Sequence, residues 1–193
     1  MLALIVIVLG TLLLALLYGI SIYNSLVQIK HNVGTAWSNI DVLLKQRHDE
    51  LPKLVETCRQ YKEFEQATLQ RVTEARNRVQ QARAEHDLSA LGLAEGALRA
   101  GLGQLFAVVE AYPDLKANEH FMQLLRRVTA LEEAIADRRE LYNDSVNINN
   151  VRIEQFPDSV VAGMFRFRPA QLLKFADAEK ADVDLGQMFG GHA

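Results

Sequence analysis

The sequence predicts an all-α protein in which a transmembrane helix continues into an antiparallel, up-and-down four-helix bundle. Three observations support this prediction. A long apolar run stands at the start of the 193 residues, apolar residues then recur at spacings of three and four, and no segment alternates as a half-buried strand would. Four amphipathic stripes in succession are typical of four packed helices.

The apolar run extends from Leu2 to Ile22, and the first charged side chain is Lys30. At a helical rise of about 1.5 Å per residue the run spans roughly 31 Å, the hydrocarbon thickness of a bilayer. The alternative is a cleaved secretory signal, which has a basic start, a shorter apolar centre and a small-residue cleavage site. The run has none of these features, so we expect residues 1–23 to form a retained anchor that contacts the bilayer through residues 2–22.

Basic residues predict the orientation of this anchor. Lys30, Lys45 and Arg47 follow the run, whereas only the α-amino group of Met1 precedes it. Because basic flanks stay in the cytoplasm, we expect a single-pass protein with a short N-terminus outside and the C-terminal domain in the cytoplasm. The presence of a single cysteine, Cys58, is consistent with a reducing compartment, because one thiol cannot form an internal disulfide. We interpret its side chain as a small buried apolar group rather than a catalytic thiol.

Residues 24–175 are expected to form the helical domain, with coiled-coil-like apolar spacing. The stripes consist of Val33, Trp37, Ile40 and Leu44; Leu54, Cys58, Tyr61, Val72, Ala75, Val79 and Ala82; Leu88, Leu91, Leu98, Leu102, Leu105 and Val109; and Phe121, Leu124, Val128, Leu131, Ile135 and Tyr142. As the only tryptophan, Trp37 is expected to be a buried anchor of the bundle.

Helix boundaries follow from prolines and polar residues. Pro52 predicts the start of a new helix, and a continuous, kinked helix is the alternative. Asp87 or Ser89 is expected to cap the third helix, and Tyr112-Pro113 to break the chain after it. The asparagine-rich stretch after Tyr142 predicts that the fourth helix frays or ends some residues either side of Asn150.

The C-terminal part of the sequence changes character at Phe156-Pro157. Between residues 156 and 175 apolar side chains alternate with Arg166, Arg168 and Lys174, which favours docking on the bundle and leaves a lipid surface as the alternative. Residues 176–193 carry four acidic residues against one lysine and lack periodicity, so a disordered tail is expected.

Polar residues among the stripes carry a resemblance to a known family. The segments are Tyr23-Asn24-Ser25-Leu26-Val27, Ala36-Trp37-Ser38-Asn39-Ile40-Asp41, Arg47-His48-Asp49 with Leu51-Pro52 and Leu54-Val55-Glu56, Glu110-Ala111-Tyr112-Pro113-Asp114-Leu115-Lys116, Phe121, Tyr142-Asn143 and Phe156-Pro157. In this order and spacing they closely resemble the LemA family of bacterial membrane proteins. The resemblance implies a short outer N-terminus, one span of the bacterial inner membrane and a four-helix cytoplasmic bundle, and it implies no activity.

Two positions depart from the family pattern. The pattern repeats Tyr-Asn one heptad after Tyr142-Asn143, where this sequence has Asn149-Asn150, so a shared aromatic contact is not expected there. The pattern also favours Phe-Gly-Phe where this sequence has Phe165-Arg166-Phe167. A tight glycine conformation at residue 166 is therefore not expected.

No catalytic, cofactor-binding or metal-binding residues are predicted. The histidines are scattered, Glu132-Glu133 lacks the Glu-x-x-His of di-iron bundles, and the glycines between Gly92 and Gly103 lack the ending of a phosphate loop. The net charge of −3 without a basic stripe makes nucleic acid an unlikely partner. Asn39, Asp41 and Arg47 are open to two interpretations, a recognition patch or polar residues that fix helix register.

The sequence is compatible with two candidate functions. The first is a non-enzymatic, membrane-anchored scaffold that binds unidentified proteins or copies of itself, and the alternative is an enzyme or cofactor protein with an unrecognised site in the bundle. Convergent ionisable residues in the interior would favour the enzyme, and a leucine core the scaffold. Thr11, Ala15 and Gly19 lie on one face of the span, and such small residues favour a homo-oligomer through close helix approach.

The anchor gives the first prediction. The protein should pellet with membranes and resist carbonate washing, because an inserted span survives the removal of electrostatic attraction. Deletion of residues 2–22 should release a soluble, helical domain, detected by fractionation and circular dichroism. Full-length protein in the soluble fraction with an intact N-terminus would contradict the anchor.

Overall fold

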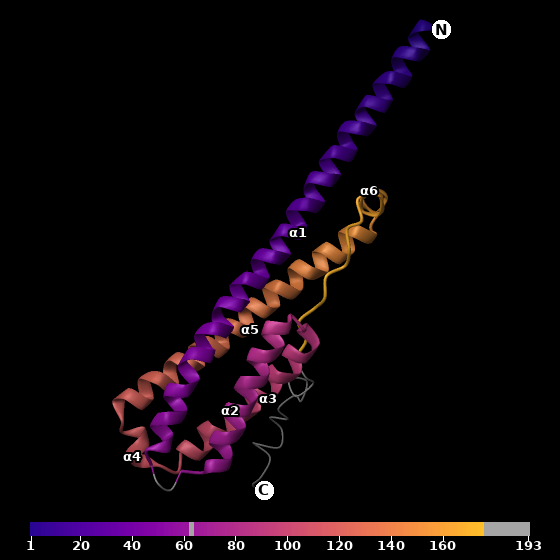
Figure 1. Cartoon of the computed structure of the whole chain (residues 1–193). Coiled ribbons are helices and arrows are strands. Elements are labelled where there is room, and N and C mark those ends of the chain that lie inside the picture. Colours follow the sequence, from indigo (N-terminus) through magenta and orange to yellow (C-terminus); the bar gives the residue numbers. More distant parts are fainter. Residues whose placement is uncertain (62–63, 176–193) are drawn as a thin grey trace, which may run out of the picture. The chain divides into compact units, whose positions relative to one another are not determined.

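The computed structural model describes residues 1–61 and 64–175, so the predicted disordered tail, residues 176–193, lies outside the described residues. The helices are α1 (Leu2–Arg59), α2 (Gln66–Glu85), α3 (Leu88–Val109), α4 (Pro113–Lys116), α5 (Glu119–Glu154) and α6 (Asp158–Met164), as shown in Figure 1. No strand occurs in the described ranges, which confirms the predicted all-α class.

Two compact units divide the chain. The first, here called the anchor unit, comprises Met1–Gln46 and Leu131–Leu172. The second, here called the hairpin unit, comprises Arg47–Ala130 and the chain from Leu173. Each contains a part of α1 and a part of α5, so both long helices pass from one unit to the other.

Among the described residues, α1 is the one helix that is long and apolar enough to cross a membrane, judged by length and composition alone. Its apolar part lies at the N-terminus, in the anchor unit. Its large apolar side chains are exposed from Leu2 onward, and Ile22 is the first to be buried. Within the anchor unit, other segments therefore pack on α1 only from about the predicted end of the span onward.

Beyond that point α1 and α5 pack together within the anchor unit. Tyr142 of α5 is buried and meets Trp37 of α1 edge to face, with ring centroids 5.8 Å apart. Trp37 itself is only partly buried, so the expectation of a buried anchor is wrong. The smaller Ile40 and Leu44 on the same stripe fill the interior, and Trp37 lies at its edge.

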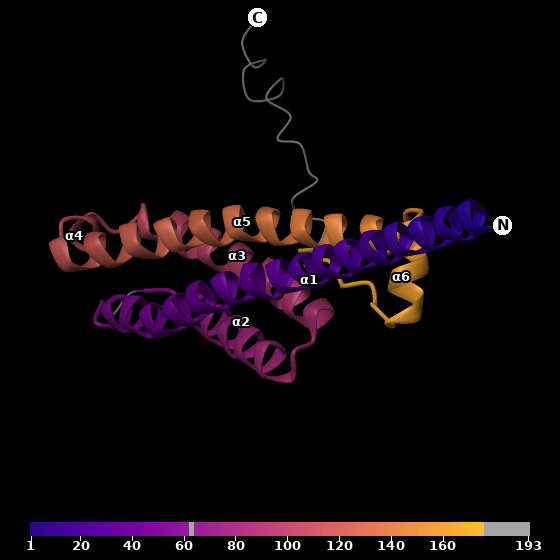
Figure 2. The ribbon, with the colours of Figure 1, turned by 90° about the horizontal axis from the view of Figure 1, so that it is seen from above.

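In the hairpin unit, α2 and α3 form a helical hairpin around the connection His86-Asp87 (Figure 2). His86 takes the left-handed conformation, with φ of 55°, and Asp87 N donates to Ala82 O at 3.1 Å, as in a Schellman motif. The Asp87 carboxylate then accepts from the backbone N–H groups of Ser89 and Ala90, both at 2.9 Å. Asp87 is therefore the cap of α3, one of the two residues predicted for that role.

A buried ion pair crosses the leucine-rich interior of the hairpin unit. Arg47 of α1 donates to Glu95 of α3, and their side chains are 1% and 2% exposed. Nearby, Glu50 of α1 accepts from Arg127 of α5 at 2.8 Å. Removing one partner of the Arg47–Glu95 pair leaves an uncompensated buried charge at a cost of about 3 to 5 kcal/mol. The Glu50–Arg127 pair contributes less, because the Arg127 side chain is 57% exposed and solvent screens its charge.

α1 continues through Pro52 to Arg59, so the prediction of a new helix at Pro52 is wrong and the continuous alternative is correct. Proline lacks an N–H and cannot donate to the carbonyl of His48, one turn earlier. Arg76 of α2 supplies a substitute donor, with its Nε 3.0 Å from His48 O. The second predicted stripe is accordingly divided, because Leu54 and Cys58 belong to α1 and the rest lies beyond it.

His48 also accepts from Arg76 through its ring, since Arg76 Nη2 lies 2.8 Å from His48 Nε2 and a guanidinium has no acceptor. Burial, followed by the charge of Arg76, lowers the pKa of His48. The ring is therefore neutral at pH 7, with its proton on Nδ1. This buried Nδ1 has no hydrogen-bond partner among the described residues.

The last described residues pack on α3 within the hairpin unit. Leu173 is buried, and Arg99 lies 5.7 Å from the ring centroid of Phe175. The carbonyl oxygen of Lys174 comes so close to α3 that a Cβ placed on Gly92 would overlap it. Glycine is required at this position of a leucine-rich helix because backbone passes over it.

The Pro52 contact predicts an energetic coupling. Replacing Arg76 with Ala should lower the free energy of unfolding by about 1 to 3 kcal/mol, because it leaves the His48 carbonyl unsatisfied. In a Pro52→Ala background the loss should be smaller, since the introduced alanine supplies the helical N–H. Chemical unfolding followed by circular dichroism measures both. Arg78→Ala, an exposed arginine of α2, is the control, and equal losses in both backgrounds would contradict the coupling.

Candidate functional site

A pocket of about 600 Å³ opens on the surface of the anchor unit. One wall is the stretch of α1 that follows the predicted span, and the other is the chain that leaves α6. The lining residues are Tyr23, Val27, Lys30, His31, Val33, Asn149, Phe165, Arg166, Phe167, Arg168 and Ala170. None of them was singled out as a ligand-binding residue from the sequence.

The pocket combines aromatic and cationic groups. Tyr23 contacts both phenylalanines, with ring centroids 4.6 Å from Phe165 and 5.9 Å from Phe167. Lys30, Arg166 and Arg168 contribute positive charge, and no aspartate or glutamate is among the lining residues. Such a lining favours an anion that carries apolar groups.

Arg166 owes its position to the end of α6. It takes the left-handed conformation, with φ of 58°, so the expectation that no glycine-like conformation occurs here is wrong. Phe167 N donates to Ala162 O at 3.0 Å and Arg166 N to Gly163 O at 3.4 Å, the two hydrogen bonds of a Schellman motif. These bonds hold the backbone where glycine is usual, and an arginine in this conformation costs about 1 kcal/mol or more.

The chain after Arg168 is held by asparagine side chains of α5. The Asn150 amide accepts from Ala170 N at 2.8 Å and donates to Ala170 O at 3.0 Å, while Asn149 donates to Arg168 O at 3.4 Å. About two turns earlier in α5, the Tyr142 hydroxyl donates to Gln171 O at 2.8 Å. These side chains bond the extended segment, and α5 passes the asparagines to end at Glu154, within a few residues of Asn150 as predicted.

α6 itself packs on α1 within the anchor unit. Ala162 is buried against Ile22 and Leu26, the first buried apolar residues of α1. Arg152 of α5 binds the buried carboxylate of Asp158 and also lies 3.3 Å from Ser25 Oγ. These contacts fix α6 beside the predicted end of the span.

The residues considered for chemistry from the sequence lie elsewhere. Asn39 is exposed, Asp41 is half-buried, and Arg47 pairs with Glu95, which supports the register interpretation for Arg47. Burial raises the pKa of the Cys58 thiol to about 12. No group of three or more His, Cys, Asp or Glu side chains able to hold a metal ion occurs among the described residues.

Sequence reasoning missed Glu95 and the pocket. Glu95 had a detectable signal, because it is an acidic residue at helical spacing between Leu91 and Leu98 on an otherwise apolar stripe. The pocket had none, since it depends on where the chain after α6 returns along α5.

The conformation of Arg166 predicts a stabilising substitution. Arg166→Gly should raise the free energy of unfolding by about 0.5 to 1 kcal/mol, because glycine takes positive φ without a steric penalty. Arg168→Gly, two residues later outside the left-handed region, is the matched control and should not stabilise. Unfolding of the detergent-solubilised full chain measures both, and a destabilised Arg166→Gly variant would contradict the backbone argument.

Comparison with known proteins gives a family match and several relatives. The LemA family matches over residues 36–185. The chain is 25% identical over 165 residues to "Protein LemA" of Metamycoplasma hominis, an alignment that covers 86% of this chain and 74% of that protein.

A second set of relatives shares a shorter stretch. The chain is 29% identical over 96 residues to "Magnetosome protein MamQ 1" and "Magnetosome protein MamQ 2" of Paramagnetospirillum magneticum. These alignments cover 50% of this chain and 35% of each relative, so the chain spans about a third of the length of the magnetosome proteins it matches.

Proposed function

Because the chain belongs to the LemA family, we propose that it is a membrane-anchored, non-enzymatic helical scaffold that acts through contacts with other proteins or with copies of itself. In this proposal residues 2–22 cross the bacterial inner membrane, with the N-terminus outside and the helical domain in the cytoplasm. The exposed apolar start of α1 and the basic residues after it support this arrangement. The up-and-down four-helix bundle is also part of the proposal.

The observation that carries the non-enzymatic role is that the buried charged side chains form ion pairs between helices. The buried charged side chains of the described residues are Arg47, Glu50, Glu95 and Asp158. Each is engaged in an ion pair, Arg47 with Glu95, Glu50 with Arg127 and Asp158 with Arg152. Catalysis needs ionisable groups that remain available to a substrate, whereas these join helices and none lines the pocket.

Self-association is proposed through the small-residue face of the span. Thr11, Ala15 and Gly19 recur every four residues, and the Thr11 hydroxyl is satisfied by Val8 O at 2.9 Å in the same helix. A Cβ added at Gly19 would meet nothing within 4 Å. The face is open in the single chain, and close packing of two such faces is a common means of association in lipid.

Crosslinking in intact membranes, followed by mass spectrometry, tests the proposal. Wild-type protein should give adducts with itself or with a defined set of proteins. Ala15→Leu with Gly19→Leu should reduce self-adducts several-fold, because the larger side chains prevent close helix approach. Gly10→Leu is the matched control, since Gly10 lies on another face of α1 and is equally open.

A wild-type protein that forms no adducts in its native membrane and is monomeric in mild detergent would overturn the scaffold. Adducts unaffected by the double substitution would retain the scaffold and refute the role of this face.

A further inference from the structure

We propose that the anchor unit binds an anionic phospholipid of its own membrane, with the lipid phosphate in the pocket among Lys30, Arg166 and Arg168. The outer apolar side chains of α6 enter the boundary between headgroups and acyl chains. This inference rests on the membrane anchor proposed above, and it adds a second, lipid-specific contact to the span.

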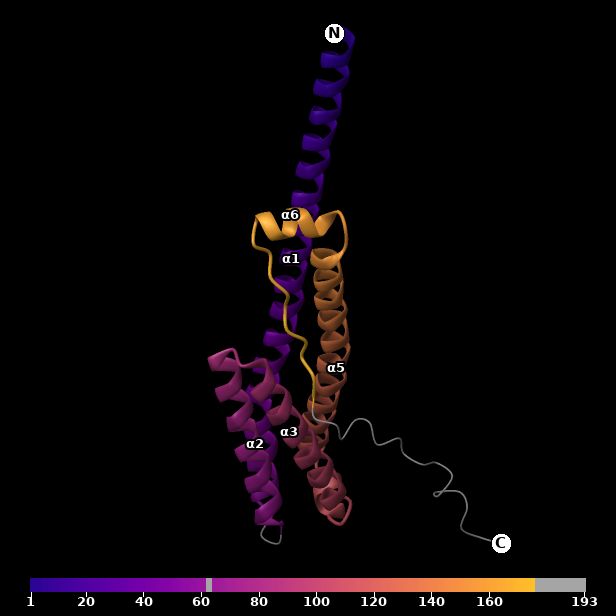
Figure 3. The same cartoon turned by 90° about the vertical axis from the view of Figure 1, so that its right-hand side faces the viewer.

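The position of α6 is the first support. Figure 3 shows α6 lying across α1, and Figure 1 shows it end-on beside α1. Ala162 of α6 contacts Ile22 and Leu26. These residues flank Tyr23, the aromatic residue at the predicted end of the span, and tyrosine is enriched at membrane interfaces. A short helix that crosses a spanning helix at this level lies along the membrane surface.

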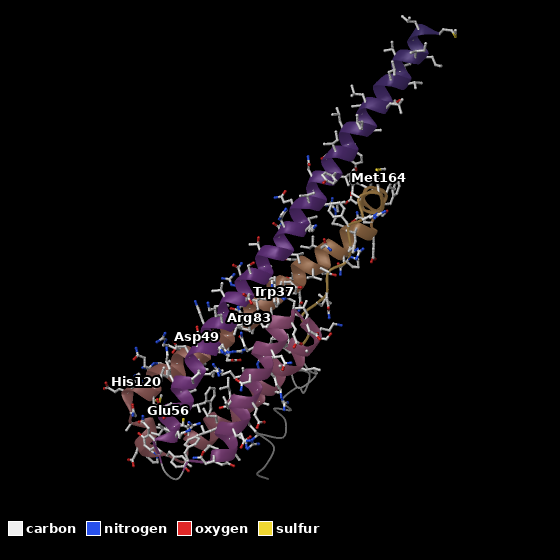
Figure 4. All side chains as sticks on the ribbon, viewed as in Figure 1. Trp37, Asp49, Glu56, Arg83, His120 and Met164 are labelled. Atoms are coloured by element: carbon white, nitrogen blue, oxygen red, sulfur yellow. The ribbon has the colours of Figure 1, made fainter. Side chains whose placement is uncertain are left out.

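The two faces of α6 are the second support. Asp158 and Ala162 face inward and are buried. Val160 and Met164 of α6 are 57% and 72% exposed, and the phenylalanines that flank the helix, Phe156 and Phe165, are 79% and 55% exposed. Figure 4 shows Met164 on the side of α6 nearer the N-terminal part of α1.

Continuity with the span identifies lipid as the occupant of this apolar surface. The exposed apolar side chains of the predicted span extend to Ile20, and Tyr23 at the end of the span contacts Phe165. A contiguous exposed apolar patch normally marks a protein or membrane contact. Here the patch adjoins residues that already lie in the bilayer, so hydrocarbon covers both.

The charges of the pocket identify the headgroup. Lys30 follows Tyr23 by about 10 Å of helix. Its long side chain can extend back along α1 and so bring the ammonium group closer to the membrane interface. Arg166 and Arg168 lie on the opposite wall, and the lining contains no acidic residue. Three cations beside aromatic rings match a phosphate attached to acyl chains, whereas a zwitterionic headgroup would bring its own cation into the same space.

The depth of α6 is measured first. Full-length protein is reconstituted in phosphatidylcholine vesicles with about 30% phosphatidylglycerol, with and without lipid brominated near the acyl carbonyl. In a Trp37→Phe background, Met164→Trp should lose most of its emission to brominated lipid. The unmodified protein, whose only tryptophan is Trp37, is the control and should keep its emission, because Trp37 lies about 21 Å of helix beyond Tyr23.

Headgroup selectivity is measured second, by counting phosphatidylglycerol and phosphatidylcholine retained on the protein after mild detergent extraction. Wild-type protein should retain phosphatidylglycerol in excess. Replacing Lys30, Arg166 and Arg168 with Gln should weaken this preference by about fivefold per charge, at low ionic strength. Arg138→Gln, an exposed arginine of α5 in the same unit, is the matched control and should retain wild-type selectivity.

The outcomes separate this inference from the anchor. Protein that fails to resist carbonate washing refutes the anchor itself. Inserted protein with an unquenched Met164→Trp, or with no preference for phosphatidylglycerol, refutes the lipid site alone. Crosslinks from residue 164 to another protein instead of lipid would identify the α6 surface as a protein interface and overturn the inference.

Discussion

The structure depends on the continuity of α1 through Pro52. A single helix supplies the exposed apolar segment, one side of the anchor unit and, from Arg47 onward, one side of the hairpin unit. A break at Pro52 would release the last turns of α1, including Leu54 and Cys58, from the interior of the hairpin unit. At this point the side chain of Arg76 bonds the His48 carbonyl, which proline leaves without a helical partner.

Hydrophobic periodicity predicted the helices well because each stripe is a local pattern of burial. Most of the third and fourth stripes are buried at the predicted spacing, whereas Leu88 and Leu131 are only partly buried. Asp87 caps α3 as its position indicates. Two of the wrong expectations share a physical cause. Pro52 and Arg166 each violate a local preference, and each is stabilised by hydrogen bonds that single-residue preferences do not contain.

Asn149 and Asn150 show how a tertiary hydrogen bond can change the structural effect of a residue type. Asparagine is a poor helix former because its amide competes for backbone groups. In α5 the amides of Asn149 and Asn150 instead bond the backbone of residues 168–170, which runs alongside the helix. The same groups that would end an isolated helix here position the wall of the pocket.

Cys58 has a practical consequence. Its side chain is buried, and a pKa of about 12 leaves almost no thiolate to react at neutral pH. Maleimides and disulfide-forming oxidants should therefore bypass it in the folded protein. A single cysteine introduced on the surface becomes the dominant labelling site without removal of the native one, so spin labels and fluorophores can be placed at chosen positions in an otherwise natural sequence.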